Sequence, residues 1–282
     1  MTTPTAPGRD EALAQLIESA LDHLAQDWAL LLAAQQGALR ALSAARRRRA
    51  PHTGAVPPAI RDALAAFTTA TARFNTDAGA LVERWAAVDL PRAYRIGAED
   101  ALHAAVLPRG AVRPVFIWTP AHQDVLSLLT GACYPVLIRR IADTVRRSQA
   151  FGRAVAAAAR TAQGPRAKEL AAQHPLDTVT YEHGAQHPAA SWARAALAAQ
   201  SVTVANTGAL TATTADLEAR WVQVTDGPEC GWTSHPELDR AHDTLRSAEE
   251  AATFPIAHPG CLRRFTPRPD LNTAPIEEGQ PI

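Results

Sequence analysis

Apolar residues recur every three to four positions along the first two-thirds of the chain, which is the period of an amphipathic helix. Thr119 and Pro120 have the residue types of a helix start, with threonine at the N-cap and proline at the first helical position. Pro135 removes one backbone hydrogen bond from the helix that follows, so we expect a kink there. The pattern predicts four helices, over residues 10–45, 59–87, 94–107 and 119–162.

The pattern changes twice along the chain. Residues 112–118 are β-branched or aromatic at several positions and are predicted to be extended. Residues 177–186 alternate and contain His183-Gly184, which predicts a hairpin turn. A further Ala-rich helix is expected over 188–212 and a strand over 220–225, and Ser247 begins a capping box that predicts one more short helix.

Together these elements predict a mainly α protein. We expect a long helical region over residues 1–170 and a small α+β C-terminal module over 171–266, with a hairpin, a helix and a Cys/His knuckle. Residues 267–282 are proline-rich and are predicted to form an extended tail.

Two of the three cysteines lie in the last quarter, each close to a histidine, as Cys230-x4-His235 and His258-x2-Cys261. Four such ligands in two close pairs suit a tetrahedral Zn²⁺ site, so Zn²⁺ is the candidate cofactor. Two other interpretations stay open: buried cysteines beside surface histidines, and a Cys230–Cys261 disulfide. Cys133 is distant in sequence and is expected to be a small core residue.

The same segment carries a family resemblance. The stretches Trp221-Val-Gln-Val-Thr-Asp-Gly-Pro-Glu-Cys230 and His258-Pro-Gly-Cys261-Leu-Arg263 resemble a C-terminal signature of minor head (minor capsid, head-morphogenesis) proteins of tailed double-stranded DNA phages. The form here is most similar to that seen in phages of actinobacteria. Upstream, Asn206-Thr-Gly208 is similar to the Asn-x-Gly that ends a helix in the family, and the resemblance covers roughly residues 178–270.

The chain departs from the family pattern at two places. Many members have Cys-x2-Cys where this chain has Cys230-Gly-Trp-Thr233, and Cys-x-Cys where it has Cys261-Leu-Arg263. Two thiolate ligands of the family are therefore missing. Either His235 substitutes for one of them, or the metal is lost and only the fold remains.

The resemblance implies a minor structural protein of a phage head, bound to the portal protein and the capsid and involved in head assembly or in DNA packaging and delivery. It would lie in the virion head, and in the host cytoplasm during assembly. The sequence has no P-loop, Gly-x-Gly-x-x-Gly, Gly-x-Ser-x-Gly or His-Glu-x-x-His motif, so we expect no enzymatic activity. The alternatives are a metal-dependent enzyme or toxin-like domain that uses the Cys/His cluster, and a basic helical nucleic-acid-binding module.

Charge is balanced overall but uneven along the chain. The sequence has 28 basic and 28 acidic residues, yet residues 139–168 contain one acidic residue, Asp143. DNA, or an acidic portal or capsid surface, is the candidate partner of this stretch, and a solvated helix surface is the alternative. The arginines in question do not share one narrow helix face: Arg139, Arg140, Arg146, Arg147 and Arg153. No apolar run approaches the roughly 20 residues that span a bilayer, so no membrane contact is expected.

Overall fold

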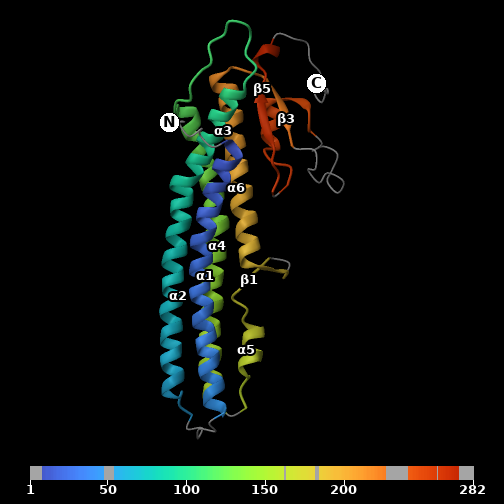
Figure 1. The fold of residues 1–282 in the computed structure, drawn as a ribbon. Coiled ribbons are helices and arrows are strands. Elements are labelled where there is room, and N and C mark those ends of the chain that lie inside the picture. The colour runs from blue at the N-terminus through green and yellow to red at the C-terminus, as the bar shows by residue number, and fades with distance from the viewer. Residues whose placement is uncertain are drawn as a thin grey trace, which may run out of the picture. The chain divides into compact units, whose positions relative to one another are not determined.

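The structure is a computed structural model that describes residues 8–47, 54–161, 163–181, 184–226, 241–258 and 260–272. It is 71% helical, which confirms the predicted mainly α class with a small α+β part (Figure 1). The helices are α1 (Arg9–Arg47), α2 (Pro58–Arg84), α3 (Leu90–Ala104), α4 (Pro120–Ala159), α5 (Ala167–Gln173), α6 (Ala189–Thr211) and α7 (Ala248–Thr253). Short π and 3-10 turns are η1 (Trp85–Asp89), η2 (Ala212–Asp216) and η5 (Pro269–Leu271), and the strands are β1 (Thr178–Thr180), β2 (Gln186–Pro188), β3 (Trp221–Thr225), β4 (Thr244–Ser247) and β5 (Arg264–Pro267).

Contacts group the chain into two compact units, which are described separately. Unit 1 comprises Met1–Ser19, Trp85–Cys133 and Arg194–Ile282. Unit 2 comprises Ala20–Arg84 and Tyr134–Ala193. Each unit is assembled from segments that are distant in sequence. The linear division at residues 170 and 266 is a different description of the chain and stays a prediction.

Unit 2 is held together by aromatic side chains on the apolar stripes of its helices. Trp28 of α1 meets Phe74 of α2 edge to face at 4.9 Å between ring centroids. Phe67 of α2 meets Phe151 of α4 in the same manner at 5.0 Å. Such pairs add about 0.5–1.5 kcal/mol each to the burial of the rings. All four rings are buried, so these pairs mark the faces on which the helices of unit 2 pack.

Unit 2 also contains the predicted hairpin. Strands β1 and β2 pair antiparallel with Val179 opposite His187. Gly184 has a φ of +83° in the connecting turn, a left-handed backbone conformation that residues other than glycine rarely adopt. The turn chemistry of the sequence therefore predicted this pairing.

In unit 1, helices α3 and α6 pack at very short range through two glycines. A Cβ added to Gly97 would lie 1.8 Å from the backbone oxygen of Ala205. One added to Gly208 would lie 2.3 Å from the backbone oxygen of Tyr94. No real Cβ atom approaches a carbonyl so closely, so glycine is required at both positions for the backbones to meet.

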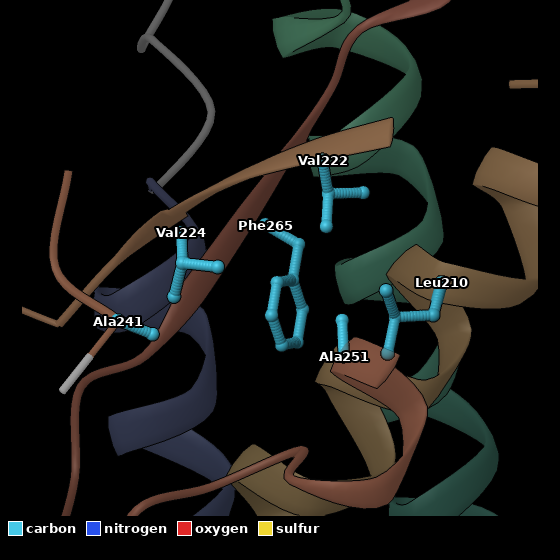
Figure 2. Packing of buried hydrophobic residues seen from close by; sticks show 6 residues of the cluster. All are labelled: Leu210, Val222, Val224, Ala241, Ala251 and Phe265. Atoms are coloured by element: carbon cyan, nitrogen blue, oxygen red, sulfur yellow. The ribbon is translucent and has the colours of Figure 1, made fainter. Parts of the chain in front are cut away.

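The α+β part of unit 1 is a three-stranded antiparallel sheet in the order β4-β3-β5. Its apolar residues meet α6 and α7 in one cluster, with the ring of Phe265 at its centre (Figure 2). The cluster comprises Leu210, Val222, Val224, Ala241, Ala251 and Phe265. The hydroxyl of Ser247 accepts a hydrogen bond from the backbone N–H of Glu250 at 3.1 Å, which confirms the predicted N-cap of α7.

Among the helices in the described ranges, α4 has the length and apolar composition of a membrane span. One 18-residue window of α4 reaches a mean hydropathy of 1.4, and 11% of that window is buried. The sequence expectation differed because an average over 18 residues tolerates polar residues that interrupt an apolar run. Length and composition alone do not place a helix in a bilayer, and the expected absence of membrane contact stays a prediction.

Candidate functional site

The four predicted metal ligands are described only in part. Cys230 and His235 lie outside the described residues, so the four-residue cluster stays a prediction. His258 and Cys261 lie on one turn, in which the backbone N–H of Cys261 donates to the carbonyl of His258 at 2.9 Å. Cys261 is buried and His258 is half-buried. Within the part of the chain that the structure describes, no three His, Cys, Asp or Glu side chains gather closely enough to hold a metal ion.

A buried ion pair lies beside the second of these ligand pairs. The guanidinium of Arg263 donates to both carboxylate oxygens of Asp226, from Nε to Oδ1 at 2.6 Å and from Nη2 to Oδ2 at 3.0 Å. The remaining nitrogen, Nη1, donates to the carbonyl of Phe254 at 2.7 Å. The side chains of Arg263 and Asp226 are 2% and 0% exposed, so this is a fully desolvated bidentate pair.

Strand register explains why these two charges meet. Thr225 pairs with Arg264 at the end of the β3–β5 ladder. Asp226 is the next residue after Thr225, and Arg263 is the residue before Arg264, so the two lie next to each other at the same end of the ladder. Asp226 is four residues before Cys230, and Arg263 is two residues after Cys261. The ion pair therefore fixes one end of each segment that carries predicted ligands.

A second guanidinium, that of Arg9, is buried at the same place. Arg9 donates to the side-chain oxygen of Asn206 at 2.5 Å and to the backbone carbonyl of Arg263 at 3.2 Å. The amide nitrogen of Asn206 donates to that same carbonyl at 3.0 Å and to the carbonyl of Pro255 at 2.6 Å. Burial lowers the pKa of Arg9, while the nearby carboxylate of Asp100 acts in the opposite direction. These bonds tie the start of α1 and the middle of α6 to the entry of β5.

A further buried polar chain of unit 1 runs through Tyr94, His122 and Asp216. The hydroxyl of Tyr94 lies 2.9 Å from Nδ1 of His122, and Nε2 of His122 lies 3.1 Å from Oδ2 of Asp216. A neutral imidazole can donate from Nε2 to the carboxylate and accept at Nδ1 from the phenol. Tyr94 and His122 are fully buried, and burial raises the pKa of Tyr94 to about 12. The chain of bonds joins α3, α4 and η2.

The predicted nucleic-acid-binding arginines of α4 divide into two rows. Arg140 and Arg147 turn toward the hairpin. Arg140 donates to the carbonyl of Thr180 at 2.7 Å, and Arg147 donates to the carbonyl of Thr178 at 2.6 Å. Burial lowers the pKa of Arg147. These two guanidiniums are therefore used within unit 2, which confirms that the five arginines do not share one face.

The other row of arginines faces solvent. Arg139, Arg146 and Arg153 are exposed and are spaced seven residues apart. Successive positions at this spacing drift by only about 20° around a helix, so the three share one face. Arg146 also pairs with Asp143 at 3.2 Å, on a side chain that remains 65% exposed. This row of three arginines therefore lies at the surface along one face of α4.

Asp226, Arg263 and Asn206 were not assigned a role from the sequence, although all three lie within the stretches that carry the family resemblance. The pairing of Asp226 with Arg263 carried no sequence signal, because it depends on the pairing of β3 with β5, which joins residues tens of positions apart. The same holds for Arg9 and His122, because their partners Asn206 and Asp216 are more than 90 residues away in sequence.

Comparison with protein-family models, with curated proteins and with solved structures found no match to this chain. The resemblance to minor head proteins therefore rests on the residues quoted above.

The buried ion pair leads to a first prediction. Replacing Asp226 with Asn leaves the guanidinium of Arg263 buried without its counter-ion, so we expect the free energy of unfolding to fall by about 3–5 kcal/mol. Chemical unfolding followed by circular dichroism measures this loss. As the control, Glu99→Gln breaks an exposed pair with Arg95 and should cost less than about 1 kcal/mol. Equal effects of the two substitutions would contradict the assigned role.

The Cys/His hypothesis leads to a second prediction. If Cys230, His235, His258 and Cys261 bind Zn²⁺, the purified chain carries one zinc ion per molecule, with Zn–S bonds of about 2.3 Å and Zn–N bonds of about 2.0 Å by X-ray absorption. Cys261→Ser should abolish this zinc content and increase hydrogen exchange over residues 220–265, while Ala20–Arg84 of unit 2 stay protected.

Cys133→Ser is the matched control for the zinc measurement. Cys133 is a partly buried free thiol of α4, and burial raises its pKa to about 11. Its replacement should leave zinc content unchanged. Zinc that survives Cys261→Ser, or a mass that shows a Cys230–Cys261 disulfide, would rule out the four-ligand site.

Proposed function

We propose that this chain is a minor structural protein of a phage head that docks on a larger assembly, with the portal protein as its partner and the capsid around it. The phage assignment rests on the resemblance of residues 178–270 to minor head proteins. Docking, rather than catalysis, is the role that the arrangement of side chains supports best.

The observation that carries the proposal is the amount of exposed apolar surface in unit 1. Large apolar side chains normally lie in the core of a soluble monomer, and contiguous exposed ones mark interaction sites. Here Val112 is 91% exposed, Val115 82% and Ile117 70%, all within one short segment of chain, and Leu128 of α4 is 76% exposed. A partner that covers them would gain roughly 25 cal/mol for each Å² of apolar surface removed from water.

The buried polar residues within the stretches that resemble minor head proteins have structural roles, as expected for a scaffold protein. Asp226 and Arg263 neutralise one another in the interior, and Asn206 holds two backbone carbonyls. These polar groups are therefore engaged in positioning the β3–β5 sheet against α6. By fixing β3, β5 and α6 together, these bonds would give the C-terminal module a stable surface for a partner.

Co-purification with the portal protein encoded in the same genome tests this function. We expect the two folded proteins to associate at micromolar concentration. Leu128→Ser should weaken the association by roughly tenfold or more, because it removes a large apolar side chain from the interface. Leu30→Ser, at a 41% exposed position of unit 2, is the matched control and should have little effect. Failure of the wild-type chain to associate would overturn the proposal.

DNA is the second candidate partner, and the exposed row of Arg139, Arg146 and Arg153 favours it. Three guanidiniums at heptad spacing on one helix face can contact phosphates along a nucleic-acid backbone. Arg140 and Arg147 are directed at backbone carbonyls of unit 2 and are not part of this surface. We propose that packaged or translocating DNA meets the exposed row.

Salt-dependent binding to duplex DNA measures this interaction. Replacing Arg139, Arg146 and Arg153 with Gln should reduce the slope of log K against log salt by about 0.9 for each phosphate that the variant no longer neutralises. The control variant replaces Arg61, Arg73 and Arg84, three exposed arginines of α2, and so removes the same charge. An equal decrease of affinity in both variants would leave only non-specific attraction and would contradict a defined DNA-binding row.

A further inference from the structure

The segment that connects α3 to α4 has the side-chain pattern of a strand. Residues 112–118 form part of the loop between these helices (Figure 1), and the chain runs from 111 to 119 without a turn or bend. Val115 and Ile117 point outward, 82% and 70% exposed, while Phe116 between them is half-buried. Alternation of this kind is the period of a β-strand with one face covered. We call residues 112–118 the edge segment.

The edge segment is anchored on its inner face. Phe116 packs against the buried cluster of Ala98, Leu102 and Ala212. The ring of Trp118 stacks on that of Tyr94, with 5.6 Å between centroids. These contacts hold the segment in one conformation before any partner arrives, which lowers the entropic cost of binding.

Arg113 provides a third anchor. Its guanidinium donates to the backbone carbonyls of Leu102, His103 and Ala105, at 2.5–3.3 Å. These carbonyls belong to the end of α3, where helical hydrogen bonding leaves acceptors without a partner. Arg113 therefore caps the helix and fixes the start of the edge segment at the same time.

The backbone of the edge segment is not paired with another strand. Neighbouring residues do pair: Val106 donates to Pro267 at 3.0 Å and accepts from Asp270 at 3.3 Å. Within the described residues, positions 112–118 make no backbone–backbone hydrogen bond. An extended, apolar segment with open N–H and C=O groups is a template for another strand.

The two edges of this segment are not equivalent. An extended chain directs the backbone N–H and C=O groups of alternate residues to the same side. Pro114 has no N–H, so the side that carries Val112, Pro114 and Phe116 lacks one donor. The opposite side, formed by Arg113, Val115 and Ile117, keeps its full set of donors and acceptors. This second side is the better template.

We propose that the edge segment receives an extended strand of the docking partner by β-augmentation, along the side formed by Arg113, Val115 and Ile117. The inference rests on the proposed docking function and names how the partner binds. Backbone hydrogen bonds would supply affinity, and alternate apolar side chains of the partner strand would cover Val115 and Ile117.

Charge further defines the partner strand. Residues 104–121 contain Arg109 and Arg113 and no Asp or Glu. A partner strand with acidic residues beside its apolar positions is therefore complementary. A bilayer would leave the backbone groups unsatisfied, and a helix has no free backbone groups to offer them. Among possible occupants, a strand alone satisfies both the side chains and the backbone.

Hydrogen exchange in the complex with the portal protein tests this inference. In the free chain the amides of Arg113, Val115 and Ile117 should exchange fast, and in the complex they should become protected. This measurement uses the wild-type chain, so it does not depend on the folding of a variant. A complex that forms while residues 112–118 stay unprotected overturns β-augmentation and leaves the docking function intact.

A pair of variants at Val115 tests this edge. Val115→Pro removes a donor from the proposed side and should weaken binding about tenfold or more. Val115→Thr keeps the backbone donor and the β-branched shape, so it should bind more tightly than Val115→Pro. Equal helical circular dichroism and melting temperature establish that both variants fold. Undiminished binding by Val115→Pro overturns the inference, and no association of the wild-type chain overturns both the docking function and this inference.

Discussion

A buried guanidinium must find acceptors for all its N–H groups and a negative charge nearby, and unit 1 is organised around two of them. Arg263 meets this demand with Asp226 and a carbonyl. Arg9 meets it with Asn206, the carbonyl of Arg263 and the nearby carboxylate of Asp100. Because that carbonyl accepts from both Arg9 and Asn206, the start of α1, the middle of α6 and the entry of β5 are positioned together. Removal of any one group leaves others desolvated without a partner, which is far more costly than removal of a surface pair.

Local chemistry made most of the elements predictable. Helical periodicity located α1, α2, α4 and α6, and Ser247 with Glu250 located the start of α7. These features depend on neighbours within about one turn of chain, which the sequence displays directly. The order of the sheet was not predictable in this way, because the pairing of β3 with both β4 and β5 joins residues tens of positions apart.

In the candidate site, too, features set by neighbouring residues were predictable and those set by the tertiary fold were not. The sequence pointed to the segment around Cys261 and to the arginines of α4, and His258 and Cys261 do share a turn. It did not separate Arg139 from Arg140, since the two are adjacent and chemically identical. Their difference comes from a rotation of about 100° around the helix, which directs one to solvent and the other to the carbonyl of Thr180. Likewise the buried partners of Arg9 and His122 follow only from the tertiary fold.

The crossing of α3 and α6 has a mechanical consequence. At Gly97 and Gly208 the backbones approach so closely that a single methyl group would collide with a carbonyl oxygen. Sliding α3 by even one residue, about 1.5 Å, would bring the Cβ of a neighbouring residue into each of these gaps. The helices can shift past each other only after they separate. The two helices are therefore locked in one register, so a displacement of one along its axis must carry the other with it.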